Sequence, residues 1–255
     1  MNFTKQFLRA WDSTLASALK LPLNRVSRYD FLAKSLNPFL SFDGLERLHT
    51  QAPQTLVSMR VIDRLASDVI EYHTKAAAGL AVGTGLLGGI NVLLGASVDT
   101  LQYFGNLLQM TQKLAYLYGW EDFRSGSLQE EEVRARLTFL LGSALGVQEA
   151  DLMLRHTALR GHSPHLAEEI LPKETALKLY KNILRSLSYA AYICAGKTIL
   201  CGVVSDKLTP VLGATASWAA TYYFIRPQGL RLKNLLGDIA IETEEMQGRL
   251  PQGSL

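Results

Sequence analysis

The glycines between Gly83 and Gly88 form the pattern G-x-G-x-x-G, which holds a pyrophosphate in many nucleotide-binding proteins. That chemistry needs a strand before the first glycine, a helix after the last one, and an acidic residue about 20 positions further on. Residues 76–78 are alanines and make a poor strand, and the first acid after the pattern, Asp99, comes too early. We therefore expect no dinucleotide or other cofactor.

Three histidines, His156, His162 and His165, lie close together in the sequence and could serve as metal ligands or acid–base groups. Their spacing matches no metal-site pattern, and the chain has no H-E-x-x-H sequence, so we predict no metal site. The chain also lacks the G-x-S-x-G motif of many hydrolases and the Walker A lysine loop of NTPases. The enzyme alternative is a soluble helical hydrolase or peptidase-like protein, whose fold assembles a site from the histidines with Asp99 and Asp206.

Asp99 and Asp206 each follow a long apolar run. Ionisable groups in that position are costly in lipid and usually pair with another group or face a polar cavity. An aspartate also satisfies free backbone N–H groups at the start of a helix. We expect both residues to be N-caps of the helices that follow them.

The segment that leads to Asp99, residues 76–98, is uncharged and rich in glycine. Pairs of glycines four residues apart share one face of a helix, where two backbones can approach closely. The length suffices for a membrane-spanning helix, but glycine is a poor helix former, and a hairpin broken near the middle is an alternative. The glycines expected to pack helices together are Gly79, Gly83, Gly85, Gly88, Gly89 and Gly95.

Helical periodicity recurs along the chain, and we predict an all-α multi-helix bundle with the glycine-rich apolar helices or hairpins at its centre. Helices are expected from Pro53 to residue 75, over residues 100–118, 127–145 and 149–159, and after Pro172. A turn is expected at Asp43–Gly44. Residues 208–225 form another uncharged block, either a buried helix or a marginal span, in which Pro210 opens the helix.

The N-terminal residues Phe3, Phe7, Trp11, Leu15 and Leu19 recur every four positions. They predict an amphipathic helix that packs on the body of the protein or lies on a membrane surface. We divide the chain into residues 1–52 (this helix and a connector), 53–225 (a helical domain) and 226–255 (an amphipathic tail).

The amino-acid composition and net charge restrict the class of protein. Of the 255 residues, 48% are hydrophobic and 19% are charged, and the net charge is +3. This small charge, without a basic stripe, argues against nucleic acid as a partner. The N-terminal residues interrupt any apolar run with Lys5, Arg9 and Asp12, so no signal peptide is expected. We expect the protein in the cytoplasm or at the cytoplasmic face of the cell membrane.

The motifs from Gly79 through Gly88–Gly89, Gly95 and Asp99 to Tyr118–Gly119 resemble the signature region of the EcsC family. Leu208 to Ala214, with Pro210 and Gly213, resembles the second apolar segment of that family. The chain has Asp-Thr-Leu where the family often has Asp-Ile-Pro, and Tyr-Gly-Trp where it often has Tyr-Gly-Tyr. The resemblance implies a bacterial helical protein, sometimes encoded beside an ABC transporter, without an established activity.

Together these features favour a non-enzymatic, membrane-associated protein that packs its glycine-rich helices with lipid or with a membrane protein such as an ABC transporter. Besides the hydrolase described above, a helical bundle that encloses a lipid-like ligand is the alternative. The pattern does not define an oligomeric state.

Overall fold

The structure is a computed structural model that describes residues 15–16, 18–19, 24–84, 98–124, 130–160, 178–183, 185–186, 210–246 and 248. Over these ranges the chain forms helices and no strand, so the predicted all-α multi-helix bundle is confirmed. The helices are α2 (Arg28–Leu36), α3 (Phe42–Arg47), the 3₁₀ turn η2 (Pro53–Thr55), α4 (Met59–Thr84), α5 (Val98–Leu117), α6 (Glu130–Ala144), α7 (Gln148–Arg160) and α10 (Pro210–Met246).

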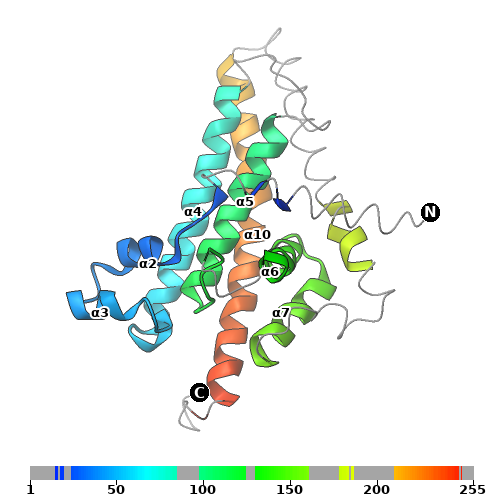
Figure 1. Cartoon of the computed structure of the whole chain (residues 1–255). Helices are drawn as coiled ribbons and strands as arrows, with labels where there is room; N and C mark the ends of the chain where they lie inside the picture. The colour runs from blue at the N-terminus through cyan, green and yellow to red at the C-terminus, as the bar shows by residue number, and fades with distance from the viewer. Residues whose placement is uncertain are drawn as a thin grey trace.

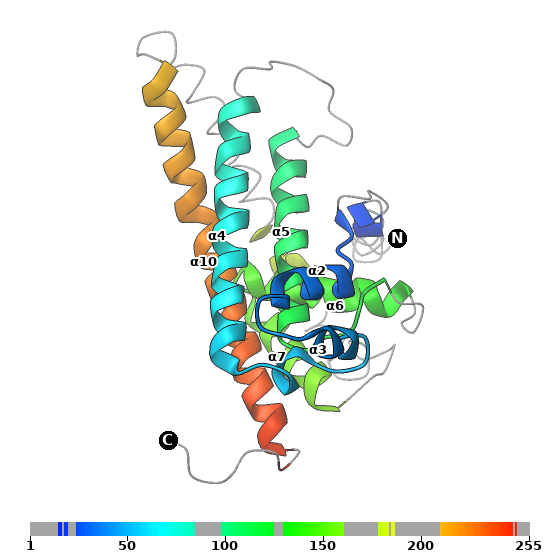
Figure 2. The same ribbon diagram turned by 90° about the vertical axis from the view of Figure 1, so that its left-hand side faces the viewer.

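Three long helices, α4, α5 and α10, lie side by side and form the axis of the molecule (Figure 1). The C-terminal end of α4 and the N-terminal ends of α5 and α10 lie at the same end of this bundle (Figure 2). Helix α4 is therefore antiparallel to the other two. Helix α2 packs on α5, and helices α6 and α7 pack around the lower half of α10. The bundle thus has one end built from α4, α5 and α10 and another end surrounded by the shorter helices.

Helix α4 differs from the prediction at both ends. Pro53 begins the 3₁₀ turn η2 rather than the long helix, which starts at Met59. At the other end α4 continues beyond residue 75, through Gly79 and Gly83, to Thr84. The first part of the glycine-rich segment is therefore the end of a long helix, because that helix is already nucleated and packed by the residues before it.

Helix α10 joins two segments that were expected to be separate. It begins at Pro210, as predicted, and continues through the uncharged block and across Arg226 to Met246. Pro227 lies inside it and leaves the carbonyl group of Tyr223 without its helical donor. The Tyr223 side chain is 77% exposed, so this side of the helix faces solvent, which can satisfy the carbonyl. The change in composition at residue 226 thus falls within one helix, and the division into domains stays a prediction.

Helix α3 corrects the prediction of a turn at Asp43–Gly44. The side chain of Ser41 caps the helix by accepting a hydrogen bond from the backbone N–H of Gly44 at 3.4 Å. Asp43 lies in the first turn, where a negative charge favours a helix. Two residues that are common in turns are therefore part of a short, capped helix.

The core surrounds helix α5. Its residues from Tyr103 to Tyr118 are almost all buried, and Tyr116 is among the largest side chains that are fully buried. Leu15 and Leu19, from the predicted N-terminal helix, are buried in the same core. The described end of that segment thus packs on the body of the protein.

Candidate functional site

The structure places part of the predicted glycine pattern. Gly79 and Gly83 belong to the backbone of α4, and Pro210 and Gly213 to that of α10. The remaining predicted positions lie outside the described residues: Gly85, Gly88, Gly89, Gly95, Asp206, Phe3, Phe7 and Trp11.

Asp99 is not the N-cap that the sequence predicted. Helix α5 begins one residue earlier, at Val98, so Asp99 already has helical backbone in the first turn. The capping prediction for Asp206 lies outside the described residues.

Charged residues stop at the same level on helices α4 and α10. The last charged residue of α4 is Lys75, and residues 76–84 carry no charge. On α10, residues 210–225 carry none, and Arg226 is the first charged residue. Glu71 contacts both cations, with Oε1 at 3.2 Å from Nζ of Lys75 and Oε2 at 3.9 Å from Nε of Arg226. These contacts show that the two changes in charge lie side by side.

Helix α5 brings the ammonium group of Lys113 to the same region. Residues 100–112 carry no charge, so Asp99 is the single charged residue of α5 before Lys113. The ammonium group of Lys113 lies 2.9 Å from Nε2 of His73 and 5.3 Å from the ring centre of Tyr72. His73 and Tyr72 directly follow Glu71 on α4, so the ammonium group of Lys113 lies close to the level at which α4 and α10 lose their charges.

We name the part of α4 and α10 beyond this level the uncharged end, which comprises residues 76–84 and 210–225. The first turns of α5, which include Asp99, lie beside it (Figure 2). On α10 it extends about 24 Å at 1.5 Å per residue. No helix among the described residues has both the length and the apolar character needed to cross a membrane.

Exposed tyrosines mark the start of the uncharged end. Tyr72 on α4 is 63% exposed and Tyr223 on α10 is 77% exposed, next to Lys75 and Arg226. The hydroxyl group of Tyr222 donates a hydrogen bond to Glu71 at 3.1 Å. Tyrosine is enriched where proteins cross from water into lipid, because its ring is apolar and its hydroxyl group is polar. We call Tyr72, Lys75, Tyr223 and Arg226 the collar.

A buried polar cluster lies just inside the collar. Nδ1 of His73 is 2.8 Å from Oδ1 of Asn106, whose Nδ2 donates to the backbone carbonyl of His73 at 2.9 Å. Asn106 therefore presents an acceptor to Nδ1, which places the ring proton there and leaves Nε2 to accept from Lys113. Burial, and then the charge of Lys113, lower the pKa of His73 to about 4. His73 is thus neutral at pH 7.

The Tyr118–Gly119 motif forms a corner at the other end of α5. Gly119 has a φ of 84°, a conformation that suits glycine, and the hydroxyl group of Tyr118 donates to Oδ1 of Asp63 at 2.6 Å. The buried guanidinium group of Arg28 donates to the carbonyl groups of Trp120, Leu48 and Gln51. This motif therefore ties α5 to α4 and to the segment around α2, which is a structural role.

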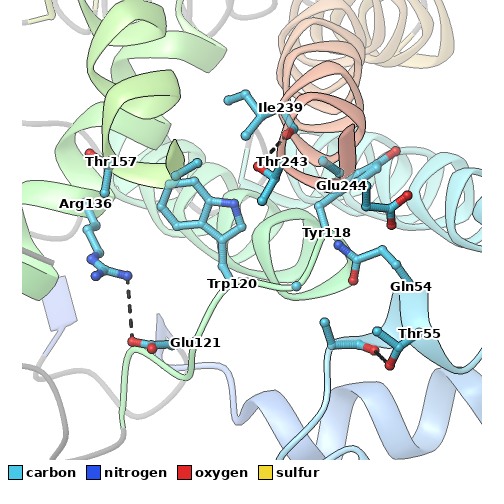
Figure 3. A pocket seen from close by; sticks show the side chains of 14 residues that line it. Gln54, Thr55, Tyr118, Trp120, Glu121, Arg136, Thr157, Ile239, Thr243 and Glu244 are labelled. Carbon is cyan, nitrogen blue, oxygen red and sulfur yellow. Dashed lines mark hydrogen bonds and ion pairs between the residues drawn. The ribbon is translucent and has the colours of Figure 1, made fainter. Parts of the chain in front are cut away.

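A cavity of about 300 Å³ lies beside this corner, between the segment after α5, the turn η2, helices α6 and α7 and the last turns of α10 (Figure 3). Arg136 pairs there with Glu132 at 2.7 Å and lies 3.9 Å from Glu121. Glu244 also borders the cavity. The cavity is lined by both apolar and charged side chains, and it lies far from the uncharged end (Figure 1).

The residues of the hydrolase alternative are not brought together where they can be located. Asp99 is at the start of α5, and His156 is on α7, toward the other end of the molecule (Figures 1 and 2). His162, His165 and Asp206 lie outside the described residues. Within the described ranges, no group of three or more His, Cys, Asp or Glu side chains is placed to hold a metal ion.

Close helix packing occurs at glycines that the sequence did not single out. A Cβ atom on Gly229 of α10 would lie 2.9 Å from Cγ1 of Ile70, and one on Gly142 would lie 2.8 Å from Cβ of Ala150. A Cβ atom on Gly105 of α5 would lie 2.8 Å from Oδ1 of Asn24. Isolated glycines inside amphipathic helices were the available signal for all three.

Searches of protein-family models, curated proteins and solved structures gave no match to this chain. The resemblance to the EcsC family therefore stays a prediction from the motifs.

Proposed function

We propose that this chain is a non-enzymatic, membrane-associated helical protein whose uncharged end inserts into one leaflet of a membrane. One observation carries the proposal. The charges of α4 and α10 stop side by side, at Lys75 and Arg226, close to the ammonium group of Lys113, and exposed tyrosines stand at that level.

The distribution of charge supports this proposal physically. A charged side chain costs about 2.5–3.5 kcal/mol when it is placed in the middle of a membrane, so uncharged helix ends enter lipid far more easily than charged ones. Tyrosine, lysine and arginine are favoured at the boundary between lipid and water. The collar has this composition, and the charged lower half of the bundle would remain in water.

The EcsC resemblance agrees with this proposal, since that family combines two apolar segments with a helical architecture and sometimes a neighbouring ABC transporter. Alternatively, the uncharged end binds a membrane protein, such as a transporter, instead of lipid. We place the protein at the cytoplasmic face of the cell membrane on the same grounds.

Vesicle flotation tests the proposal. The full chain is mixed with phosphatidylcholine vesicles in the absence of detergent, and we expect it to rise with them in a density gradient. Tyr223→Asp should weaken the binding by about fivefold, or about 1 kcal/mol, because a carboxylate replaces an interfacial ring.

The matched control is Leu152→Asp. Leu152 is an apolar residue on α7 that is 64% exposed and lies away from the collar. This change should leave vesicle binding as it is in the unmodified chain. If the unmodified chain stays below the vesicles, or if both variants lose binding equally, lipid insertion through the uncharged end is wrong.

A further inference from the structure

Lys113 is a half-buried cation without a carboxylate partner among the described residues. Its ammonium group donates to the neutral His73 ring at 2.9 Å and faces the rings of Tyr72 and Phe31, whose centres are 5.3 Å and 5.9 Å away. Aromatic faces and a neutral imidazole stabilise a cation only in part. A charge removed from water normally has an opposite charge beside it, so this site favours an anion.

A second lysine lies near this place on α2. Lys34 is exposed and follows Phe31, whose ring faces the Lys113 ammonium group, by one helical turn. Burial of the Lys113 amine, and then the positive charge of Lys34, lower the pKa of Lys113. With Lys34 one turn from Phe31 and Lys113 facing the same ring, this side of α2 and α5 carries two positive charges that favour an anion with more than one oxygen acceptor. An anion bound between them would relieve this repulsion and keep Lys113 protonated.

The position of this pair in the bundle indicates the source of the anion. Lys113 contacts Tyr72 and His73, which directly follow Glu71, the residue that contacts both Lys75 and Arg226. When the uncharged end is in lipid, this level coincides with the headgroups. Lysine binds phosphate well as a point charge.

We propose that Lys113 and Lys34 bind the phosphate group of an anionic phospholipid, with His73 and Asn106 holding the Lys113 amine in place. This inference rests on the proposed function, because it assigns the lipid class that the inserted bundle selects. A basic residue at an anionic membrane surface contributes about 1 kcal/mol, which corresponds to about a fivefold preference.

The experiment compares vesicles of phosphatidylcholine alone with vesicles that also contain phosphatidic acid. We expect the unmodified chain to prefer the anionic vesicles, and Lys113→Met to reduce this preference by about fivefold. Methionine keeps an apolar stem against Tyr72 and Phe31 while it removes the charge. Lys34→Met should have a smaller effect, because Lys34 is more exposed to water.

Two further variants serve as controls. Lys113→Arg keeps the charge and should retain most of the preference for phosphatidic acid. Lys181→Met removes an exposed lysine from the segment in which Asn182 contacts Glu149 of α7, and it should leave the preference intact. Circular dichroism and thermal unfolding identify any variant that fails to fold. If Lys113→Met does, Lys34→Met decides the question, and an undiminished preference in that variant contradicts the phosphate site.

The two proposals fail differently. If the unmodified chain binds neither kind of vesicle, lipid insertion itself is wrong. If it binds both equally, or if Lys113→Met keeps the preference, the phosphate site is wrong and insertion stands. If inorganic phosphate binds to the unmodified chain but not to Lys113→Met, while vesicles show no anionic preference, the site takes free phosphate and the lipid assignment is overturned.

Discussion

At the scale of single residues, His73 shows how burial and neighbouring charges determine a protonation state. Asn106 from α5 orients the ring, and Lys113 from the same helix presents a positive charge to its other nitrogen. Lys34, from α2, adds a second positive charge to the surroundings of Lys113. Protonation of His73 would therefore bury one cation against another.

This arrangement predicts a loss of stability in acid. The pKa of His73 is about 4 in the folded chain, compared with 6.5 in an unfolded one, so the unfolded chain binds more protons between these values. The free energy of unfolding should fall as the pH decreases from 6.5 to 4, by about 3 kcal/mol from this residue. Urea unfolding at pH 7 and pH 4.5 measures the change. His73→Gln should be less sensitive to pH, and an unchanged dependence would rule out this role of His73.

Tyr118 provides a second prediction at the residue scale. Its hydroxyl group donates to a carboxylate of Asp63 at 2.6 Å, and burial followed by this carboxylate raises the pKa of Tyr118. Tyr118→Phe should lower the free energy of unfolding by about 1.5 kcal/mol, because a hydrogen bond to a charged group is lost. Tyr223→Phe removes the hydroxyl group from an exposed ring and should change stability little. Equal effects of the two changes on urea unfolding would contradict this account.

At the scale of elements, the contact of α10 with α4 and α5 depends on a residue without a side chain. Gly229 lies where a Cβ atom would be 2.9 Å from Ile70 and 3.1 Å from the sulfur of Met110. All three helices therefore meet at this position. The close approach brings the two uncharged helix segments of α4 and α10 along the same side of the bundle.

We predict that Gly229→Ala destabilises the chain by about 1–3 kcal/mol, because an overpacked crossing forces the helices apart. Gly237→Ala is the matched control in the same helix. Its added Cβ atom would be 3.7 Å from Tyr118, which is an ordinary contact, so the better helix propensity of alanine should stabilise it by up to about 1 kcal/mol. Thermal unfolding of the two variants tests this prediction. If both are stabilised, the contact of α10 with α4 and α5 at Gly229 can accommodate a Cβ atom.

At the scale of the whole molecule, the two ends of the bundle have different surroundings. The uncharged end is built from α4 and α10 beside the first turns of α5, and the charged end is covered by α6 and α7. Membrane insertion should therefore give the molecule one orientation relative to the lipid.

An environment-sensitive fluorophore measures this orientation. It is attached to a cysteine at position 223 or 152, in a chain whose Cys194 and Cys201 have been replaced by serine. Emission from position 223 should shift to shorter wavelength with vesicles, because the label enters the interface, and emission from position 152 should stay unchanged. A shift at both positions would show adsorption without orientation.

The sequence by itself determined the helical class and several helix ends. Hydrophobic periodicity depends on local spacing, so it predicted α5 to within two residues at its start and α7 to within one residue. The predicted end at residue 145 lies close to the end of α6 at Ala144, and Gly146 follows with a φ of 85°, because a left-handed conformation near a helix end favours glycine. The continuation of α10 past Pro227 was missed, because packing along α4 outweighs the local signals for a break.

Only the tertiary structure decided which residues share a level. Lys113 and His73 are 40 positions apart, and Glu71 contacts Arg226 from a distant helix. Periodicity identifies the apolar face of a helix, but the helix against which it packs, and its register, depend on contacts such as Gly229 with Ile70. The glycine-rich segment was therefore recognisable from the sequence as uncharged, whereas its place at one end of the bundle, beside a collar of tyrosines and cations, follows from how the three long helices pack.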